Sequence, residues 1–166
     1  WMVFSDGFRR TSGKSTAKRI FDVAVSLLLL VVTLPITLLT ALLIVIESGM
    51  PIFYRQERMG ECGQVFGVLK FRSMRQNAEQ AGQPQWAKKN DDRVTRVGRV
   101  IRKLRIDELP QVINVLKGDM SFVGPRPERP YFVQQLATQI PFYLNRLTVK
   151  PGITGWAQIR YPYGST

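Results

Sequence analysis

The sequence predicts an α+β fold that is mainly helical, with a membrane-inserted helix hairpin ahead of a small globular domain. Three observations predict it. Residues 20–46 form a long apolar run with a single charge, Asp22. Two runs rich in β-forming residues, 52–56 and 64–71, flank a segment with turn glycines, which is typical of a β-hairpin. Residues 94–104 place apolar and basic side chains on separate faces, as amphipathic interfacial helices do.

The apolar run would extend about 40 Å as a straight helix, more than a hydrocarbon core of about 30 Å. Pro35 lies near its middle, where it removes a backbone hydrogen bond and kinks the helix. Basic residues flank both sides, which favours keeping both flanks in the cytoplasm. They are Arg9, Arg10, Lys14, Lys18 and Arg19 before the run, and Arg55, Arg58, Lys70 and Arg72 after it. We therefore expect a re-entrant hairpin broken near Pro35; the alternative is an ordinary kinked transmembrane helix.

The apolar run divides the chain into three parts. A basic juxtamembrane linker occupies 1–19, the membrane segment 20–46, and a cytosolic domain 47–166. The opening stretch, WMVFSDGF, is typical of the interior of a protein, so we expect the chain to be a fragment of a longer one.

The composition limits both the partner and the chemistry. The chain has 24 Lys and Arg against 12 Asp and Glu, a net charge of +12, and no histidine. Such an excess points to a polyanion: nucleic acid, an anionic membrane surface or phosphorylated substrates. One cysteine, Cys62, allows neither an internal disulfide nor a zinc site of the Cys/His type. Without histidine, a carboxylate must perform any proton or nucleophile chemistry, unless a lysine, the cysteine or a metal does.

After the hairpin, the sequence predicts a short polar helix at 74–81 and a loop at 82–92. Trp86 in this loop is either a lid or interface anchor, or a partly buried loop residue. The basic face of the helix at 94–104 is either a solvated surface or a contact with anionic lipid headgroups. This face contains Arg96, Arg99, Arg102 and Lys103.

A further helix is expected from the acid pair, with Asp107 as its N-cap, to Lys117, ending at Gly118. More helix is expected over 128–145, interrupted at Pro141. Three aromatic residues in the tail suit either a membrane interface or the core. They are Trp156, Tyr161 and Tyr163.

The adjacent acids Asp107 and Glu108 have two interpretations. They can be a helix cap with an acidic first turn, which stabilises a helix without any chemistry. They can also form a reactive site, because a helix N-terminus near arginines binds phosphate. Adjacent helical residues point about 100° apart, so one carboxylate can attack while the other holds a divalent metal, preferably Mg²⁺. The positive surroundings are expected to keep Asp107 ionised.

The stretch Pro125-Arg126-Pro127 predicts a stiff turn. Prolines on both sides of the arginine fix the backbone that presents it, and a rigidly held guanidinium suits bidentate phosphate binding. The alternative is a simple turn with an exposed arginine.

Together, these stretches resemble the bacterial sugar transferase family. The resemblance rests on LRIDELPQVINVLKGDMSFVGPRPE (104–128), FYRQERMG, LKFRSM and KPGITGWAQIR, which occur in the order expected over residues 18–163. Members are monotopic polyprenyl-phosphate phosphoglycosyl transferases that begin the assembly of exopolysaccharide, O-antigen and glycoprotein glycans. The opening WMVFSDGFRR further resembles the junction before the catalytic domain of long-form members.

The resemblance implies roles for individual residues. Asp107 would be the nucleophile that accepts a sugar phosphate, and Glu108, with Asp107, would bind Mg²⁺. Arg102 and Arg126 match positions associated with substrate phosphate binding. Two further candidates for phosphate binding fall in the KFR motif, namely Lys70 and Arg72, and Pro35 matches the break in the membrane helix.

The resemblance also implies substrates and a location. The donor would be a nucleotide-diphosphate sugar, by default a UDP-sugar, and the acceptor undecaprenyl phosphate. The enzyme would bind anionic lipids at the cytoplasmic face of the bacterial inner membrane, and dimeric long-form relatives allow a homodimer. Members continue beyond the PYG region, so a C-terminal segment is expected to be missing here.

Two other function classes fit the charge. The main one is a non-enzymatic, basic, membrane-bound adaptor whose acid pair merely caps a helix. A membrane-tethered nucleic-acid binder is disfavoured, because no nucleic-acid-binding module is recognisable in the sequence.

Overall fold

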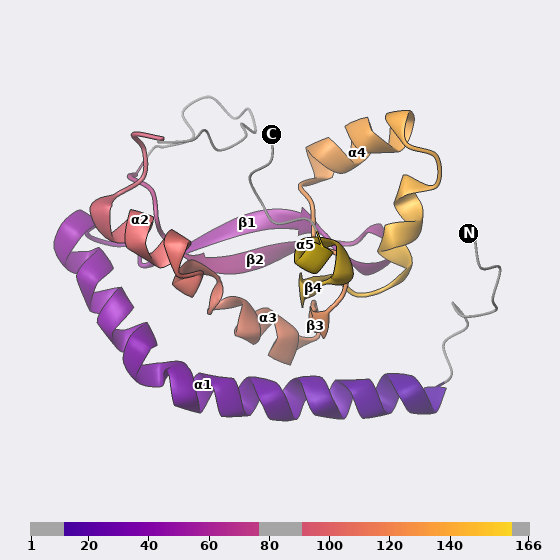
Figure 1. The fold of residues 1–166 in the computed structure, drawn as a ribbon, viewed down its shortest axis with the longest axis horizontal. Helices are drawn as coiled ribbons and strands as arrows, with labels where there is room; N and C mark the ends of the chain where they lie inside the picture. Colours follow the sequence, from indigo (N-terminus) through magenta and orange to yellow (C-terminus); the bar gives the residue numbers. More distant parts are fainter. Residues whose placement is uncertain (1–11, 77–90, 161–166) are drawn as a thin grey trace.

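The computed structural model describes residues 12–76 and 91–160. Several predictions lie outside these residues, wholly or in large part: the basic residues Arg9 and Arg10, the polar helix at 74–81, and the loop at 82–92 with Trp86. The aromatic residues Tyr161 and Tyr163 lie outside them too. The described part is mainly helical, with one β-hairpin and one long apolar helix at its N-terminal side (Figure 1).

Helix α1 runs from Ser12 to Ser48 and includes Pro35. The sequence predicts two helices separated by a break, whereas the structure has one continuous helix that bends along its length (Figure 1). A single proline removes one hydrogen bond, so the helix continues when the neighbouring turns stay paired. The Thr33 hydroxyl donates to Leu29 O at 2.7 Å and the Thr37 hydroxyl to Thr33 O at 2.9 Å, so threonines bond backbone carbonyls on the turns beside the proline.

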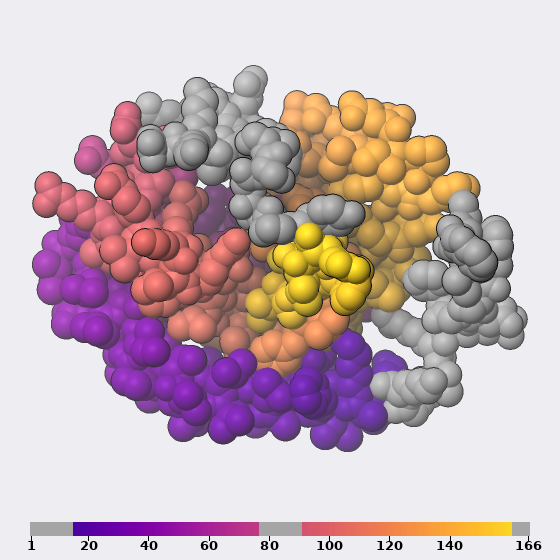
Figure 2. Space-filling model, viewed as in Figure 1, coloured from indigo at the N-terminus to yellow at the C-terminus, as the bar shows by residue number. Residues whose placement is uncertain are grey.

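The distribution of polar and apolar side chains on α1 is the opposite of that on an amphipathic helix of a soluble protein. The segment 15–48 has the length and apolar composition to cross a membrane. Only 11% of its most apolar stretch is buried in the structure. The buried stripe is mostly polar, and the apolar side chains face outward. The stripe comprises Asp22, Ser26, Thr40 and Ile44. In Figure 2, α1 forms the lower and left rim of the molecule.

The predicted hairpin is confirmed. Strands β1 (Phe53–Met59) and β2 (Val65–Phe71) pair antiparallel, with Tyr54 opposite Lys70 and Arg58 opposite Phe66. Alternate residues of a strand share a face, so Tyr54, Gln56 and Arg58 lie on the same side of the hairpin as Lys70. A 3-10 turn, η2 (Glu61–Gly63), closes the hairpin.

Of two predictions about the next helices, one is wrong and the other is confirmed. Helix α2 (Arg96–Lys103) starts at Thr95, whose hydroxyl accepts from Gly98 N at 2.8 Å. Asp107 is not an N-cap: it lies inside a short 3-10 helix, η3 (Ile106–Glu108), and α3 (Gln111–Lys117) begins after Pro110. Helix α3 ends at Gly118 as predicted, because this glycine adopts a left-handed φ of 93°.

The C-terminal part adds a parallel pair of strands that the sequence did not predict. Strand β3 (Ser121–Val123) pairs with β4 (Gly152–Thr154). Between them lie α4 (Pro130–Gln139) and the 3-10 helix η4 (Tyr143–Thr148), which confirms the predicted interruption at Pro141. Helix α5 (Trp156–Arg160) follows β4 and leaves Trp156 72% exposed, which argues against a core position.

Two small hydrophobic clusters hold these elements together. One joins α1, β2 and α2 through Ile44, Phe71 and Ile101. The other joins β2, α3 and the β3 region through Val68, Val115 and Met120. Because β2 contributes to both clusters, Lys70 lies between them, close to η3.

Candidate active site

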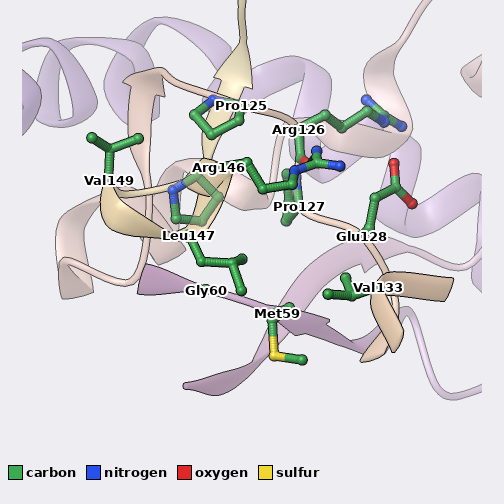
Figure 3. A pocket seen from close by; sticks show the side chains of 11 residues that line it. Met59, Gly60, Pro125, Arg126, Pro127, Glu128, Val133, Arg146, Leu147 and Val149 are labelled. Atoms are coloured by element: carbon green, nitrogen blue, oxygen red, sulfur yellow. Dashed lines mark hydrogen bonds between the residues drawn. The ribbon is translucent and has the colours of Figure 1, made fainter. Parts of the chain in front are cut away.

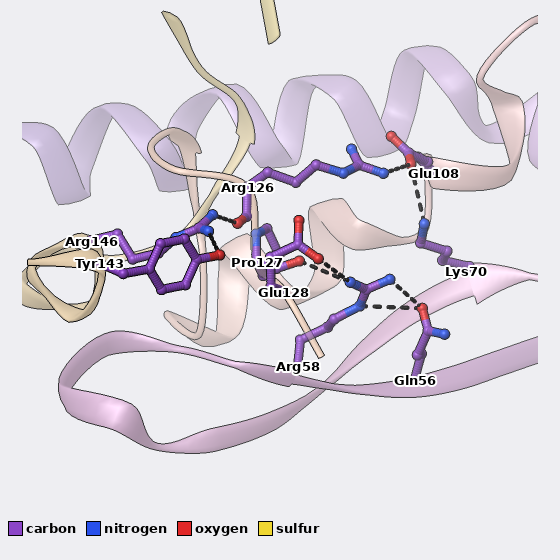
Figure 4. Close-up of polar contacts among 9 residues, drawn as sticks. All are labelled: Gln56, Arg58, Lys70, Glu108, Arg126, Pro127, Glu128, Tyr143 and Arg146. Atoms are coloured by element: carbon purple, nitrogen blue, oxygen red, sulfur yellow. Dashed lines mark hydrogen bonds and ion pairs between the residues drawn. The ribbon is translucent and has the colours of Figure 1, made fainter. Parts of the chain in front are cut away.

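Glu108 is the point at which three cationic side chains converge. Lys70 Nζ lies 3.1 Å from Glu108 Oε1, and Arg126 Nη2 lies 3.2 Å from the same oxygen. Arg105 Nη1 is more distant, at 3.7 Å. Figure 4 shows the Lys70 and Arg126 side chains reaching Glu108 from different directions, one from β2 and one from the turn after β3.

Asp107 lies next to this cluster and is more deeply buried, with 8% of the residue exposed. None of the described residues hydrogen-bonds to its Oδ1 oxygen, which is itself buried. A buried acceptor without a partner costs about 1–3 kcal/mol. Such an oxygen is therefore a candidate for contact with a ligand atom.

The left-handed turn at Arg105 sets the direction of both acids. Its φ of 60° separates α2 from η3, so the chain changes direction immediately before Asp107. Arginine adopts this conformation rarely, and strained backbone of this kind is frequent at functional sites.

The pKa values of the two acids move in opposite directions. Burial raises the pKa of Asp107 above its usual 3.8, and the charges of Lys70 and Arg102 offset this only in part. For Glu108, burial also acts upward, but Lys70 and Arg126 outweigh it and hold the pKa below the usual 4.5. The basic neighbours, which were expected to keep Asp107 ionised, do lower its pKa, but burial has the larger effect.

The pKa of Lys70 is also shifted by its surroundings. Burial lowers the pKa of Lys70 below 10.5, against the opposing effect of Glu108, and the charge of Arg126 adds to the lowering. The cluster therefore contains a carboxylate with a depressed pKa and a carboxyl with a raised one on adjacent residues. Such a divergence is typical of paired acids with different chemical tasks.

The structure brings Lys70, Asp107, Glu108 and Arg126 together but places Arg72 elsewhere. Residues two apart on a strand share a face, but β2 ends at Phe71 and Arg72 turns toward α1. Its Nη2 donates to Ser48 O at 2.7 Å and to Ser48 Oγ at 2.8 Å. The described contacts of Arg72 are thus with the end of a helix rather than with the acid pair.

The remaining predicted site residues differ in their relation to the acid pair. Arg102, near the end of α2, acts on Asp107 through its charge. Pro35 is inside α1, distant from the acid pair in sequence. Arg126 belongs to the predicted Pro125–Pro127 turn and directs its guanidinium to Glu108 (Figure 4).

Sequence reasoning did not identify Asn114, which supports the site from behind. Its Oδ1 accepts from Leu69 N at 2.9 Å, and its Nδ2 donates to Gly67 O at 2.8 Å. This side chain therefore bonds the free edge of β2 as a neighbouring strand would, and fixes the strand that carries Lys70. A polar residue within the apolar sequence of α3 was the available signal.

A small hollow lies beside the Pro125–Pro127 turn (Figure 3). Its lining comes from the end of β1, the turn, α4 and η4, and includes Met59, Val133 and Leu147. Neither Asp107 nor Glu108 lines it. In Figure 3 the Arg126 side chain extends away from the hollow.

The acid pair fits Mg²⁺ only together with a phosphorylated substrate. Within residues 12–76 and 91–160, no group of three or more Asp, Glu, Cys or His side chains is arranged to hold a metal. Mg²⁺ is commonly bound by one or two carboxylates, with water and substrate phosphates completing its coordination. The buried Oδ1 of Asp107 and the carboxylate of Glu108 supply a donor set of that kind.

Residues 13–166 match the family model described as Bacterial sugar transferase. This chain belongs to the bacterial sugar transferase family. The match covers nearly the whole chain, so the resemblance noted from the sequence motifs is confirmed. The described elements, from α1 to α5, all lie essentially within the matched residues.

Named relatives in this family are undecaprenyl-phosphate sugar phosphotransferases. A UDP-N-acetylgalactosamine-undecaprenyl-phosphate N-acetylgalactosaminephosphotransferase of Aeromonas hydrophila is 52% identical over 148 residues, covering 89% of this chain and 35% of the relative. A UDP-glucose:undecaprenyl-phosphate glucose-1-phosphate transferase of Caulobacter vibrioides is 46% identical, covering 90% and 55%. Its Escherichia coli counterpart is 44% identical, covering 90% and 32%. The chain thus spans between about a third and about half of these relatives.

Proposed function

We propose that this chain is the catalytic domain of a polyprenyl-phosphate phosphoglycosyl transferase. It would move a sugar 1-phosphate from a nucleotide-diphosphate sugar, by default a UDP-sugar, to undecaprenyl phosphate. The names of the relatives support both substrates. The observation that carries the proposal is the buried, unpartnered oxygen of Asp107 beside a Glu108 to which Lys70 and Arg126 converge. This arrangement supports a nucleophilic role for Asp107 among cations that suit a diphosphate.

In the first step, a carboxylate oxygen of Asp107 attacks the phosphorus that bears the sugar. A P–O bond forms to Asp107, the phosphoanhydride bond breaks, and its electron pair leaves with the nucleoside monophosphate. Lys70, Arg102 and Arg126 neutralise the charge on the phosphate oxygens. Burial supports this role in two ways. It raises the pKa of Asp107, which makes the carboxylate more basic, and it excludes competing water.

In the second step, a phosphate oxygen of undecaprenyl phosphate attacks the phospho-aspartate. The new P–O bond forms as the bond to Asp107 breaks, which restores the carboxylate and releases the lipid diphosphate sugar. Glu108 and Asp107 would hold Mg²⁺, which when bound supplies positive charge to the diphosphate. The lowered pKa of Glu108 keeps it ionised, as a metal ligand must be.

The contacts of α1 support a re-entrant, monotopic position in the membrane. Near its N-terminal end, Arg19 donates to Val115 O and Leu116 O of α3, both at 2.6 Å. Near its C-terminal end, Glu47 accepts from Arg96 N at 2.7 Å and Val97 N at 2.9 Å of α2. A helix that spans a bilayer places its ends on opposite sides, which is incompatible with both ends bonding one small domain.

The outward-facing apolar side chains give the same orientation. They would enter one leaflet while the polar stripe faces the domain, and the basic flanks favour the cytoplasmic face of the bacterial inner membrane. The exposed basic residues of α2 would then contact anionic headgroups. These are Arg96, Arg99 and Lys103. A homodimer, as in some long-form relatives, stays a prediction.

Intact-protein mass spectrometry tests the proposed reaction. The detergent-solubilised chain is mixed with Mg²⁺ and a panel of UDP-sugars, without the lipid acceptor. We expect a mass gain of one sugar phosphate that Asp107→Asn abolishes and that identifies the sugar. A normal gain in Asp107→Asn would exclude Asp107 as the nucleophile.

If no donor gives an adduct, one further experiment is needed. The chain extended by the C-terminal segment that the family resemblance implies is tested under the same conditions. If the extended protein also forms no adduct, the enzymatic proposal is contradicted and the membrane adaptor is favoured. The adaptor alone predicts that Asp107→Asn leaves function intact.

A further inference from the structure

The Pro125–Pro127 turn is held by its backbone carbonyls. Pro125 O accepts from Gly152 N at 2.9 Å, and Glu128 O accepts from Met59 N at 2.8 Å. The two carbonyls between them are bonded by arginine side chains rather than by backbone groups. Arg146 Nη2 donates to Arg126 O, and Arg58 Nη1 donates to Pro127 O at 3.1 Å.

This bonding pattern follows from the composition of the turn. Neither proline has an N–H, so the turn cannot join a regular hydrogen-bonded ladder on its donor side. The carbonyl groups must therefore fix the position of the turn. Consecutive carbonyls point in different directions, so one neighbouring strand cannot bond all of them. A guanidinium has several donors on a long side chain, which lets it reach such a carbonyl from a separate element.

Arg58 is itself fixed by its neighbours on the hairpin. Its Nη2 and Nε donate to Gln56 Oε1 at 2.7 and 3.2 Å, and its Nη1 lies 3.4 Å from Glu128 Oε2. Gln56 and Arg58 share a face of β1 with Lys70 of the paired strand β2. The hairpin therefore holds both Lys70, which contacts Glu108, and the arginine that bonds the turn (Figure 4).

Arg146 is fixed on the opposite side of the turn. Its Nη1 donates to the Tyr143 hydroxyl, and its guanidinium lies 4.8 Å from the centre of the Tyr143 ring. Burial raises the pKa of this tyrosine above 10, so the hydroxyl stays protonated. Both contacts anchor Arg146 within η4, and its remaining donors face the turn.

We infer that Arg58 and Arg146 are positioning residues for Arg126. They bond the carbonyls of Arg126 and Pro127, and so aim the Arg126 guanidinium at Glu108 and at a phosphate bound there. Both arginines donate to the backbone of the turn, the charge of Arg58 is partly neutralised by Glu128, and neither would contact the substrate. This inference rests on the proposed function, since it assigns Arg126 to substrate phosphate.

A spectroscopic test examines positioning without any substrate. The full chain is labelled with ¹⁵N-arginine, and the Nε–H signal of Arg126 is assigned from its loss in Arg126→Lys. Its heteronuclear NOE reports the mobility of the side chain. We expect the NOE to fall in Arg58→Met and in Arg146→Met, because the turn loses one bonded carbonyl in each. An unchanged Arg126 signal in both variants would overturn the inference.

Arg55→Met is the matched control. Arg55 lies on the same strand as Arg58, but an odd number of residues away, so it faces the other side of the hairpin and is exposed. The substitution removes the same charge without touching the turn, and the Arg126 signal should not change. Arg58→Lys and Arg146→Lys keep a cationic donor group, without the forked geometry of a guanidinium, and should restore part of the NOE.

A kinetic test asks whether the two arginines act through Arg126. The rate of covalent adduct formation is measured in a single turnover, with the donor above saturation. Each methionine variant should slow this step by about 10- to 100-fold, as small misplacements of a catalytic group do. In an Arg126→Met background the same substitutions should change the rate by less than about twofold, because they act through a residue already lost.

The kinetic outcomes separate the two proposals. If the effects of Arg58→Met and Arg126→Met multiply, the arginines act independently and the positioning claim is wrong. If neither the unsubstituted chain nor its C-terminally extended form gives an adduct, the proposed function fails. The NOE measurement then still decides whether Arg58 and Arg146 hold the Arg126 side chain.

Discussion

Arg72 donates a hydrogen bond from Nη2 to the carbonyl oxygen of Ser48 at 2.7 Å, and so joins the end of β2 to the last turn of α1. Lys70, two residues earlier, points to Glu108 instead. Two basic residues of one short motif thus have separate tasks: one holds α1 against the domain, and the other lies at the acid pair.

Replacing Arg72 with Met should therefore destabilise the protein. The carbonyl of Ser48 and the end of α1 lose a buried charged donor, at a cost of about 2–3 kcal/mol. Thermal unfolding in detergent measures it. Arg99→Met, on an exposed face of α2, is the control and should change stability by less than about 0.5 kcal/mol. A normal melting temperature with weaker donor binding would instead support the phosphate-binding role predicted from the sequence.

Asn114→Ala should also destabilise the protein. The substitution leaves Leu69 N and Gly67 O of β2 without the bonds they make in the structure, at about 1–3 kcal/mol for each buried group. Asn145→Ala, at an exposed position of η4, is the matched control. Equal unfolding free energies for the two variants would show that Asn114 does not hold the strand edge.

Glu108→Gln should impair the metal dependence of adduct formation. Glutamine keeps the size of the side chain but loses the negative charge that would bind Mg²⁺ and pairs with Lys70 and Arg126. We expect the Mg²⁺ concentration for half-maximal rate to rise by about tenfold or more, as loss of metal-site groups typically causes. An unchanged Mg²⁺ titration would argue against a ligand role for Glu108.

The acid limb of the pH–rate profile should report Asp107. Attack requires the carboxylate, so the rate falls as the pH drops through the pKa of Asp107, which burial raises above 3.8. The charge of Lys70 lowers this pKa, so Lys70→Met should move the limb to higher pH, whatever its effect on the maximal rate. A limb that stays in place or moves to lower pH would contradict the assignment.

Cysteine labelling tests the position of α1. Cys62, which is exposed, is first replaced by serine, and single cysteines are introduced by Ala17→Cys and Met50→Cys, at exposed positions near the two ends of α1. A membrane-impermeant reagent should label both from the cytoplasmic side only. Labelling from opposite sides would make α1 a spanning helix.

The sequence alone predicted the elements whose signals are local. The hairpin, the end of α3 at Gly118 and the interruption at Pro141 follow from turn residues and periodicity within a few positions. The apolar run identified α1 in the same way. The acid pair and the Pro125–Pro127 turn were also recognisable from adjacent residues, so the candidate site could be predicted from the sequence.

Only the tertiary structure decided what depends on neighbours distant in sequence. Asp107 is buried by elements on either side of it, so its pKa rises although its sequence neighbours are basic. The parallel pairing of Ser121 with Gly152 joins segments that no local pattern links. Arg58, Arg72 and Arg146 look alike in the sequence, yet each bonds a carbonyl on another element. A long cationic side chain gives no local signal of its partner, because the packing of whole elements determines which acceptor lies within its reach.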